Sequence, residues 1–187
     1  MAAELPSKIR PWLLDDGSLT GRLIGLRQGQ FAVERLHQGW SIPSLSERRL
    51  LGLGPRQLAL VREVALLLDR RPVVFARSVF PIASLTGNLA HLRRLQNRSL
   101  GAFLFRYPGM HRSPFELALL SGDSEYLPVA LQQAGPAWGR RSRFEIRGKP
   151  LMVSEVFLRQ FRPWPAALPV HRSQRGKVSA AIVPPTQ

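Results

Sequence analysis

Apolar and polar residues alternate along several segments of the chain, as they do in strands with one buried face. A two-residue link after Leu68 and a turn at Gly148 predict that neighbouring segments pair as hairpins. We therefore expect about six strands, most of them joined as hairpins. The segments are 30–40, 57–68, 71–81, 113–121, 138–146 and 149–158.

Helical spacing predicts a few short helices near the start and the middle of the chain. Pro11 suits the first turn of a helix. Ser18 and Ser99 are suited to cap the segments that follow them, and leucines recur at helical spacing through 84–98. Helices grouped apart from hairpin strands predict an α+β domain on an antiparallel sheet.

The remaining segments suggest where the folded part begins and ends. Proline and glycine punctuate 42–56, which predicts a loop, and a proline makes 124–135 ambiguous. We expect 1–10 to be a loose leader and 11–159 to form one domain. The rest, 160–187, is rich in Pro, Arg and Ser and is predicted to be a flexible basic tail.

The composition is that of a globular protein. The chain has 187 residues, of which 44% are hydrophobic, so it can bury a core. It has no cysteine, which excludes disulfides and thiolate chemistry and fits a cytoplasmic location. The N-terminus lacks a signal-peptide core, and no apolar run approaches the length that spans a membrane.

The charge is strongly positive, with 27 Lys and Arg against 12 Asp and Glu. Nearly all of the cations are arginines, and they are scattered along the chain without interleaved aromatic residues. This pattern favours non-specific attraction of polyanions over dedicated nucleic-acid recognition. A small anionic molecule is the other partner that surplus arginine suits, because a guanidinium matches a carboxylate with two hydrogen bonds.

Three charges stand on otherwise apolar strand faces. Glu155 shares a face with Leu151, Val153 and Phe157, and Arg62 and Arg77 are the lone charges on apolar faces of 57–68 and 71–81. Such a charge is costly unless it is paired and hydrogen-bonded.

Two explanations remain open for these charges. They form a buried ion pair that fixes the register of the sheet, or an anionic ligand completes them. Two arginines and one glutamate leave one positive charge in surplus, which a carboxylate ligand would neutralise. Glu155 would then bind a hydroxyl elsewhere on that ligand. Apolar walls with a few convergent polar groups are typical of small-molecule sites.

Other chemistry finds no support in the sequence. The four histidines lack metal-ligand spacing, and no cysteine joins them. No glycine-rich phosphate loop follows a strand, and there is no nucleophile elbow. The sequence offers no sign of a cofactor.

Five stretches, in order, carry a resemblance to a known family. They are WLLDDGSLTGRL (12–23), VREVALL (61–67), ARSVFP (76–81), LGAFLF (100–105) and WGRRSRFEIRGKPLMVSEVFL (138–158). From about Trp12 to Leu158, the chain resembles the chorismate pyruvate-lyase family. That family makes 4-hydroxybenzoate and pyruvate from chorismate at the opening step of ubiquinone biosynthesis. Its fold is a six-stranded antiparallel sheet with helical flaps over a closed cavity.

The resemblance implies roles for particular residues. Arg62 stands where the family grips the ring carboxylate of the product, and Glu155 where it meets the ring hydroxyl. Leu100 provides a backbone contact, and Leu19 stands where a methionine covers the ligand. Arg77 matches a second family arginine that lines the buried site. The resemblance thus implies a cofactor-independent lyase, which we expect to be a monomer.

The chain departs from the family pattern at two places. Arg159 stands where the family commonly has proline, and 121–135 is longer than expected. Two alternatives also stay open: a non-catalytic sensor domain of the same fold that binds a small aromatic acid, and a nucleic-acid binder that uses the basic tail. Whether Glu155 acts as a base or only orients the hydroxyl is also left open.

Overall fold

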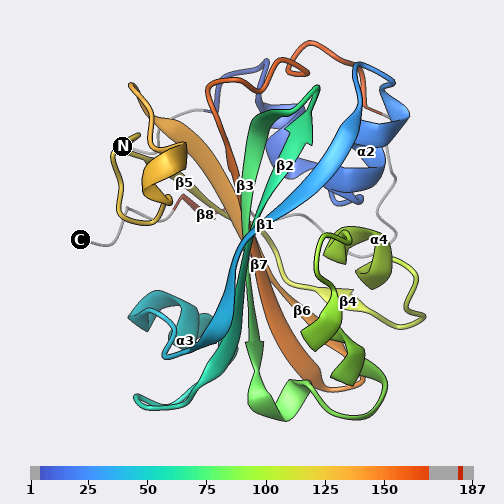
Figure 1. Cartoon of the computed structure of the whole chain (residues 1–187), viewed down its shortest axis with the longest axis vertical. Coiled ribbons are helices and arrows are strands. Elements are labelled where there is room, and N and C mark those ends of the chain that lie inside the picture. The colour runs from blue at the N-terminus through green and yellow to red at the C-terminus, as the bar shows by residue number, and fades with distance from the viewer. Residues whose placement is uncertain (1–4, 169–180, 183–187) are drawn as a thin grey trace.

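One twisted sheet forms the centre of the protein, which we describe from a computed structural model that places residues 5–168 and 181–182. Figure 1 views the sheet nearly edge-on, with helices on both sides. Its strands follow the order β1-β2-β3-β7-β6-β5-β8, and β4 also pairs with β6. The strands are β1 (Phe31–Ser41), β2 (Ala59–Leu68), β3 (Arg71–Pro81), β4 (His111–Arg112), β5 (Glu116–Leu120), β6 (Ala137–Ile146), β7 (Lys149–Phe157) and β8 (Ala181–Ile182).

The longer strands coincide with the alternating segments of the sequence, which confirms the predicted α+β architecture. The described residues add two strands of only two residues each, β4 and β8. The β5–β8 pair is parallel, and the other pairs in the described part of the chain are antiparallel.

The β2–β3 hairpin turns at Asp69 and Arg70, which both have positive φ, as a tight two-residue hairpin requires. A register shift follows at once. Leu67 pairs with Pro72, whereas Leu66 pairs with Val74, so β3 carries one extra residue at this point. This β-bulge decides which side chains of the two strands share a face.

The helices are short, and several begin where the sequence predicts. They are α1 (Arg10–Leu14), α2 (Leu19–Gly25), α3 (Leu45–Leu51) and α4 (Leu100–Leu104), with 3₁₀ turns η1 (Ile82–Ser84), η2 (Gly87–Arg94) and η3 (Val129–Leu131). Ser18 and Ser99 accept hydrogen bonds from the backbone of α2 and α4, which confirms both caps.

Two predictions of local structure are wrong, one of a helix and one of a loop. The segment 84–98 forms 3₁₀ turns rather than an α-helix, although its regularly spaced leucines are buried as expected. The predicted loop 42–56 contains α3. Ser44 and Glu47 form a capping box there, and this local signal outweighs the prolines and glycines on either side.

The two faces of the sheet carry different helices. In Figure 1, α2 and α4 lie on one side and α3 on the other. The first side packs Leu19 and Leu23 of α2 beside α1, and the leucines of η2 and α4 beside Phe80 and Phe144. This side holds the cavity described below.

Both ends of the predicted domain lie inside packed structure. Leu5 and Ile9 pack against the core that contains Trp12, as do Trp164 and the fully buried Phe161. The predicted flexibility of 1–4, 169–180 and 183–187 lies outside the described residues. No helix among the described residues is long and apolar enough to span a membrane.

Candidate active site

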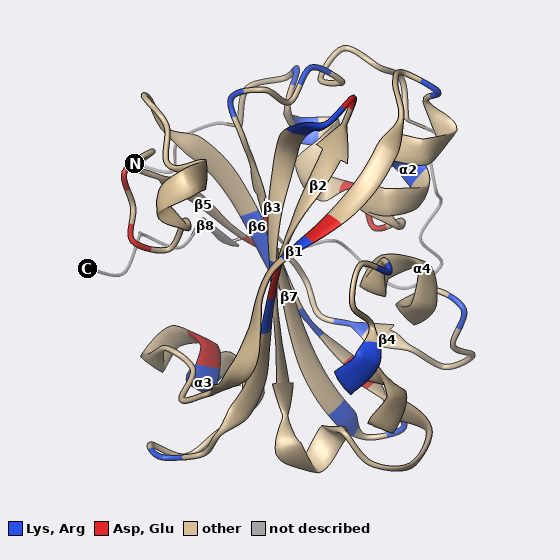
Figure 2. Ribbon diagram, in the orientation of Figure 1, with Lys and Arg blue, Asp and Glu red and all other residues tan. Residues whose placement is uncertain are grey.

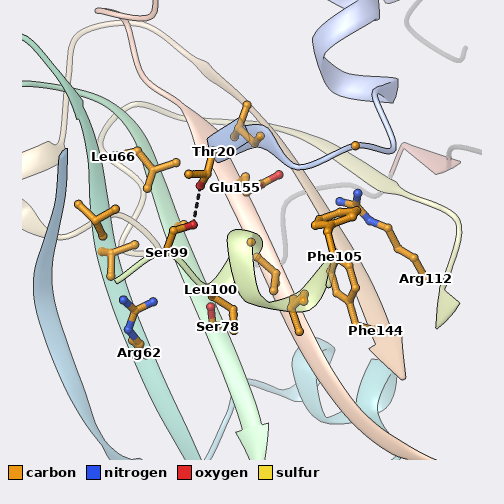
Figure 3. Close-up of a pocket in the computed structure, with 18 residues that line it drawn as sticks. Thr20, Arg62, Leu66, Ser78, Ser99, Leu100, Phe105, Arg112, Phe144 and Glu155 are labelled. Atoms are coloured by element: carbon orange, nitrogen blue, oxygen red, sulfur yellow. Dashed lines mark hydrogen bonds between the residues drawn. The ribbon is translucent and has the colours of Figure 1, made fainter. Parts of the chain in front are cut away.

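A cavity of about 40 Å³ lies between the sheet and the pair of helices α2 and α4. Figure 3 shows its polar and apolar walls. Strands β2, β3 and β7 form the floor, and the lining residues include Leu19, Thr20, Arg62, Val64, Ser78, Ser99, Leu100, Phe105, Arg112, Phe144, Val153 and Glu155.

Arg62 enters the cavity from the middle of β2 and is 1% exposed. Its Nη2 donates hydrogen bonds of 2.8 Å to the backbone carbonyls of Gln96 and Arg98. Its buried Nε has no partner, and it forms no ion pair with a described residue. Burial, with Arg35 adding repulsion, lowers the pKa of Arg62 to about 10. The part of the chain that the structure describes therefore offers this cation no carboxylate partner.

Glu155 points from β7 into the same cavity and is held by Arg140 of β6. The Arg140 Nε lies 2.6 Å from Glu155 Oε2. Its Nη1 donates to the carbonyls of Trp12 and Asp15, at 2.7 and 2.8 Å. Arg140 thus ties the end of α1 to the carboxylate and fixes where that carboxylate lies. Sequence reasoning did not single out Arg140, although it alternates with Ser142 and Phe144 on the face that pairs with the Glu155 face of β7.

Arg112 of β4 is a second cation of the cavity that sequence reasoning missed. Its Nε donates to Ser142 Oγ at 2.8 Å, and its Nη1 to the Asp16 carbonyl at 3.2 Å. The guanidinium lies over the rings of Phe115 and Phe144, 4.1 and 4.7 Å from their centroids. Burial lowers the pKa of Arg112 to about 9, and Arg140 adds repulsion. A strand of two residues gives no alternation that reveals an inward side chain.

Leu19 and Leu100 are buried and line the cavity from α2 and α4. Beside them, Ser99 Oγ donates to Thr20 Oγ1 at 2.7 Å, and this contact joins the starts of the two helices (Figure 3). The two helices therefore cover the cavity together, as the resemblance led us to expect for flaps.

The expectation that Arg77 lines the buried site is wrong. Because of the bulge in β3, Arg62 lies opposite Ser78, and Arg77 lies opposite Glu63 on the other face. Arg77 pairs there with Glu47 at 2.7 Å and Glu63 at 2.6 Å. Burial by itself lowers the pKa of Arg77, but hydrogen bonds to these carboxylates outweigh it and raise the pKa.

The arrangement suits a flat, largely apolar anion. Arg62 offers free donors at one side of the cavity, Glu155 offers carboxylate oxygens as acceptors, and leucine, valine and phenylalanine form the walls. The described part of the chain has no group of three His, Asp or Glu that could hold a metal ion. Lys and Arg are spread over many elements in Figure 2, which agrees with the scatter seen in the sequence.

Solved structures share this fold at low sequence identity. The effector domain of PhnF from Mycobacterium smegmatis superposes with a TM-score of 0.55 at 15% identity, over 78% of this chain and 91% of that one. The ligand-binding domain of a putative GntR-family transcriptional regulator from Bordetella bronchiseptica gives 0.52 at 13%, over 72% and 87%. These likenesses concern the fold alone.

Curated sequences are much more similar. We describe three of these sequences, and each is called probable chorismate pyruvate-lyase. The protein from Aromatoleum aromaticum is 43% identical over 82% of this chain and 86% of its own length. That from Alcanivorax borkumensis is 44% identical over 82% and 71%, and that from Methylococcus capsulatus is 41% identical over 87% and 98%. The family model described as Chorismate lyase matches residues 2–164. The chain therefore belongs to the chorismate lyase family.

Proposed function

We propose that the protein converts chorismate to 4-hydroxybenzoate and pyruvate without a cofactor, at the opening step of ubiquinone biosynthesis. Family membership supports a lyase. The observation that carries the proposal is Arg62: a buried cation without a carboxylate partner among the described residues, in a cavity that also holds Glu155. An aromatic hydroxy acid complements both groups. Action in the cytoplasm as a monomer stays a prediction.

The proposed reaction needs little chemistry from the protein. The bond between ring carbon 3 and the enolpyruvyl oxygen breaks, and ring carbon 4 loses its hydrogen as the ring becomes aromatic. That hydrogen is gained by the enolpyruvyl methylene, which becomes the methyl group of pyruvate. Holding both groups in reactive geometry can supply about 7–11 kcal/mol in favourable cases. A largely apolar cavity covered by α2 and α4 supports this kind of catalysis, because a bound substrate there would be shielded from bulk water.

In this proposal Arg62 binds the ring carboxylate and Glu155 accepts a hydrogen bond from the ring hydroxyl. The backbone of Leu100 contacts the carboxylate end, and Leu19 covers the ring. The ion pair of the buried Arg140 with the partly buried Glu155 supports a positioning role for the carboxylate, because the guanidinium fixes its orientation.

Replacing Glu155 with Gln tests that role. The amide keeps the shape and an acceptor oxygen but is a far weaker base. We expect kcat to fall by no more than about tenfold, since orientation rather than proton abstraction is lost. Steady-state kinetics with chorismate measure it. A loss of about a thousandfold or more, with 4-hydroxybenzoate still bound, would identify Glu155 as an obligatory base.

The reaction itself is tested by incubating purified protein with chorismate, without added metal or nucleotide. We expect 4-hydroxybenzoate and pyruvate in equal amounts, identified by chromatography and mass spectrometry. A protein that binds 4-hydroxybenzoate but never forms it would instead be a ligand-binding domain of the same fold. A different hydroxybenzoate isomer would contradict the assigned product.

A further inference from the structure

Two arginines and one glutamate line the cavity, and a third arginine lies behind the glutamate. Arg140 is committed to Glu155 and to the carbonyls at the end of α1. Arg62 and Arg112 line the cavity itself, and neither forms an ion pair with a described residue. The described site therefore carries two cations that no carboxylate contacts directly, one more than a single ligand carboxylate would pair with.

Arg112 is placed to meet a ligand. Ser142 and the Asp16 carbonyl hold its Nε and Nη1, while no described hydrogen bond uses its Nη2. Three phenylalanine rings surround the guanidinium, with centroids 4.1 to 5.9 Å away. Aromatic faces attract a cation but do not neutralise it. An anion in the cavity would supply the direct ion-pair partner that Arg112 does not have among the described residues.

The position of Arg112 relative to Glu155 is equally informative. Arg112 pairs with Phe144 across β4 and β6 and bonds Ser142, two residues along β6 from the Arg140 that holds Glu155. Glu155, Asp15 and Asp16 attract the charge of Arg112 and Arg140 repels it, whereas among the described residues Arg35 is the charge that acts on Arg62. Figure 3 draws Arg62 and Arg112 on opposite sides of the cavity. Arg112 therefore belongs to the Glu155 end.

We propose that Arg112 forms a second carboxylate subsite, which receives the carboxylate of the enolpyruvyl side chain of chorismate. The inference rests on the proposed function. With the ring carboxylate on Arg62 and the ring hydroxyl on Glu155, the enolpyruvyl ether sits on the carbon next to the hydroxyl, at the Arg112 end. Two cations then match a substrate with two carboxylates. The side-chain carboxylate stays on Arg112 as the carbon–oxygen bond breaks and leaves as part of pyruvate.

The test compares ligands with one and two carboxylates in the Arg112→Met variant. The probes are 4-hydroxybenzoate and its unreactive analogue with a carboxymethoxy group next to the hydroxyl. We expect the affinity for 4-hydroxybenzoate to change by less than about threefold, and that for the dicarboxylate to fall by about 30-fold or more. The kcat/KM for chorismate should fall by a similar factor. Titration calorimetry and steady-state kinetics measure these values.

Controls separate this role from a structural one. Methionine fills the site among three phenylalanines but removes the hydrogen bonds to Ser142 and the Asp16 carbonyl, so we expect a modest fall in unfolding temperature and compare affinities below that temperature. The Arg112→Lys variant should recover part of the lost dicarboxylate affinity, since it restores the charge. Arg106→Met, at an exposed arginine, removes a charge outside the cavity and should change neither affinity.

Two outcomes would overturn the inference: equal losses for both probes, or an unchanged affinity for the dicarboxylate. Failure of the proposed function looks different, because the parent protein would then leave chorismate intact. The two binding affinities still test the subsite in that case. A parent protein that binds neither probe contradicts both the function and the subsite.

Discussion

The two faces of the sheet treat arginine in opposite ways. On the face with α3, Arg77 is 18% exposed and forms ion pairs with Glu47 and Glu63. On the face with the cavity, Arg62 is 1% exposed, and its hydrogen-bond partners among the described residues are two backbone carbonyls. The charge of Arg77 is therefore neutralised by carboxylates of the protein itself. Among the described residues, no carboxylate forms an ion pair with Arg62 or Arg112, so the proposed function assigns their counter-charge to a ligand.

The largest expected effect comes from Arg77→Met. It would leave Glu47, which is 1% exposed, without its counter-ion, and breaking a buried pair costs about 3–5 kcal/mol. Urea unfolding should show this loss of stability, while folded protein keeps its affinity for 4-hydroxybenzoate. Adding Glu47→Gln should recover part of the loss, because the more deeply buried of the two carboxylates then carries no charge, while Glu63 stays without its partner. A stable variant that no longer binds 4-hydroxybenzoate would place Arg77 in the ligand site after all.

The next effect is that of Arg62→Met on binding. We expect affinity for 4-hydroxybenzoate to fall by about 30-fold or more, because the ring carboxylate loses its only proposed cation. Titration calorimetry measures it, and Arg71→Met, at an exposed arginine in β3, is the matched control for the change in net charge. Equal affinity in the variant and the parent would remove Arg62 from the site.

The smallest effect concerns pH. A guanidinium must be protonated to bind a carboxylate, and the pKa of Arg112 is lowered to about 9. The kcat/KM for chorismate, which reports on the free enzyme, should therefore fall as the pH rises through about 9. An ordinary arginine would keep its charge well beyond that pH. Chromatographic rate measurements between pH 7 and 10 test this. In Arg112→Met the fall should move to a higher pH, because the remaining cavity cation, Arg62, has a pKa of about 10. A flat profile in the parent would contradict the prediction.

Strand alternation was enough to place two of the site residues. Arg62 and Glu155 are lone charges on apolar strand faces, and both reach the cavity. The alternation of side chains within one strand does not depend on the turns that connect the strands. Arg77 obeys the same alternation within its own strand. Its placement failed because one extra residue in β3 moves it to the opposite face from Arg62. The residues around Pro72 contain no sequence pattern from which we could predict that bulge.

Other parts of the site were hidden for different reasons. Arg112 lies on a strand too short to show a period, and its role depends on pairing with β6. Arg140 does alternate with Ser142 and Phe144, but WGRRSRFEI has arginines on both faces, so none of them stands out. α3 was predictable in principle: Ser44 and Glu47 have capping-box spacing, which is a better guide than the prolines and glycines beside it.

The burial of Phe161 has a practical consequence for anyone who shortens this protein. Its ring packs edge-on against Trp12, with the centroids 5.0 Å apart. The Trp12 carbonyl in turn holds Arg140, which holds Glu155. A shortened version that ends with β7 would lose the ring of Phe161, which packs behind α1. We expect that loss to displace the carboxylate of Glu155, although Phe161 acts on it only through Trp12 and Arg140. Expression boundaries should therefore be drawn well past the end of β7, and after Ile182 if β8 is to be kept.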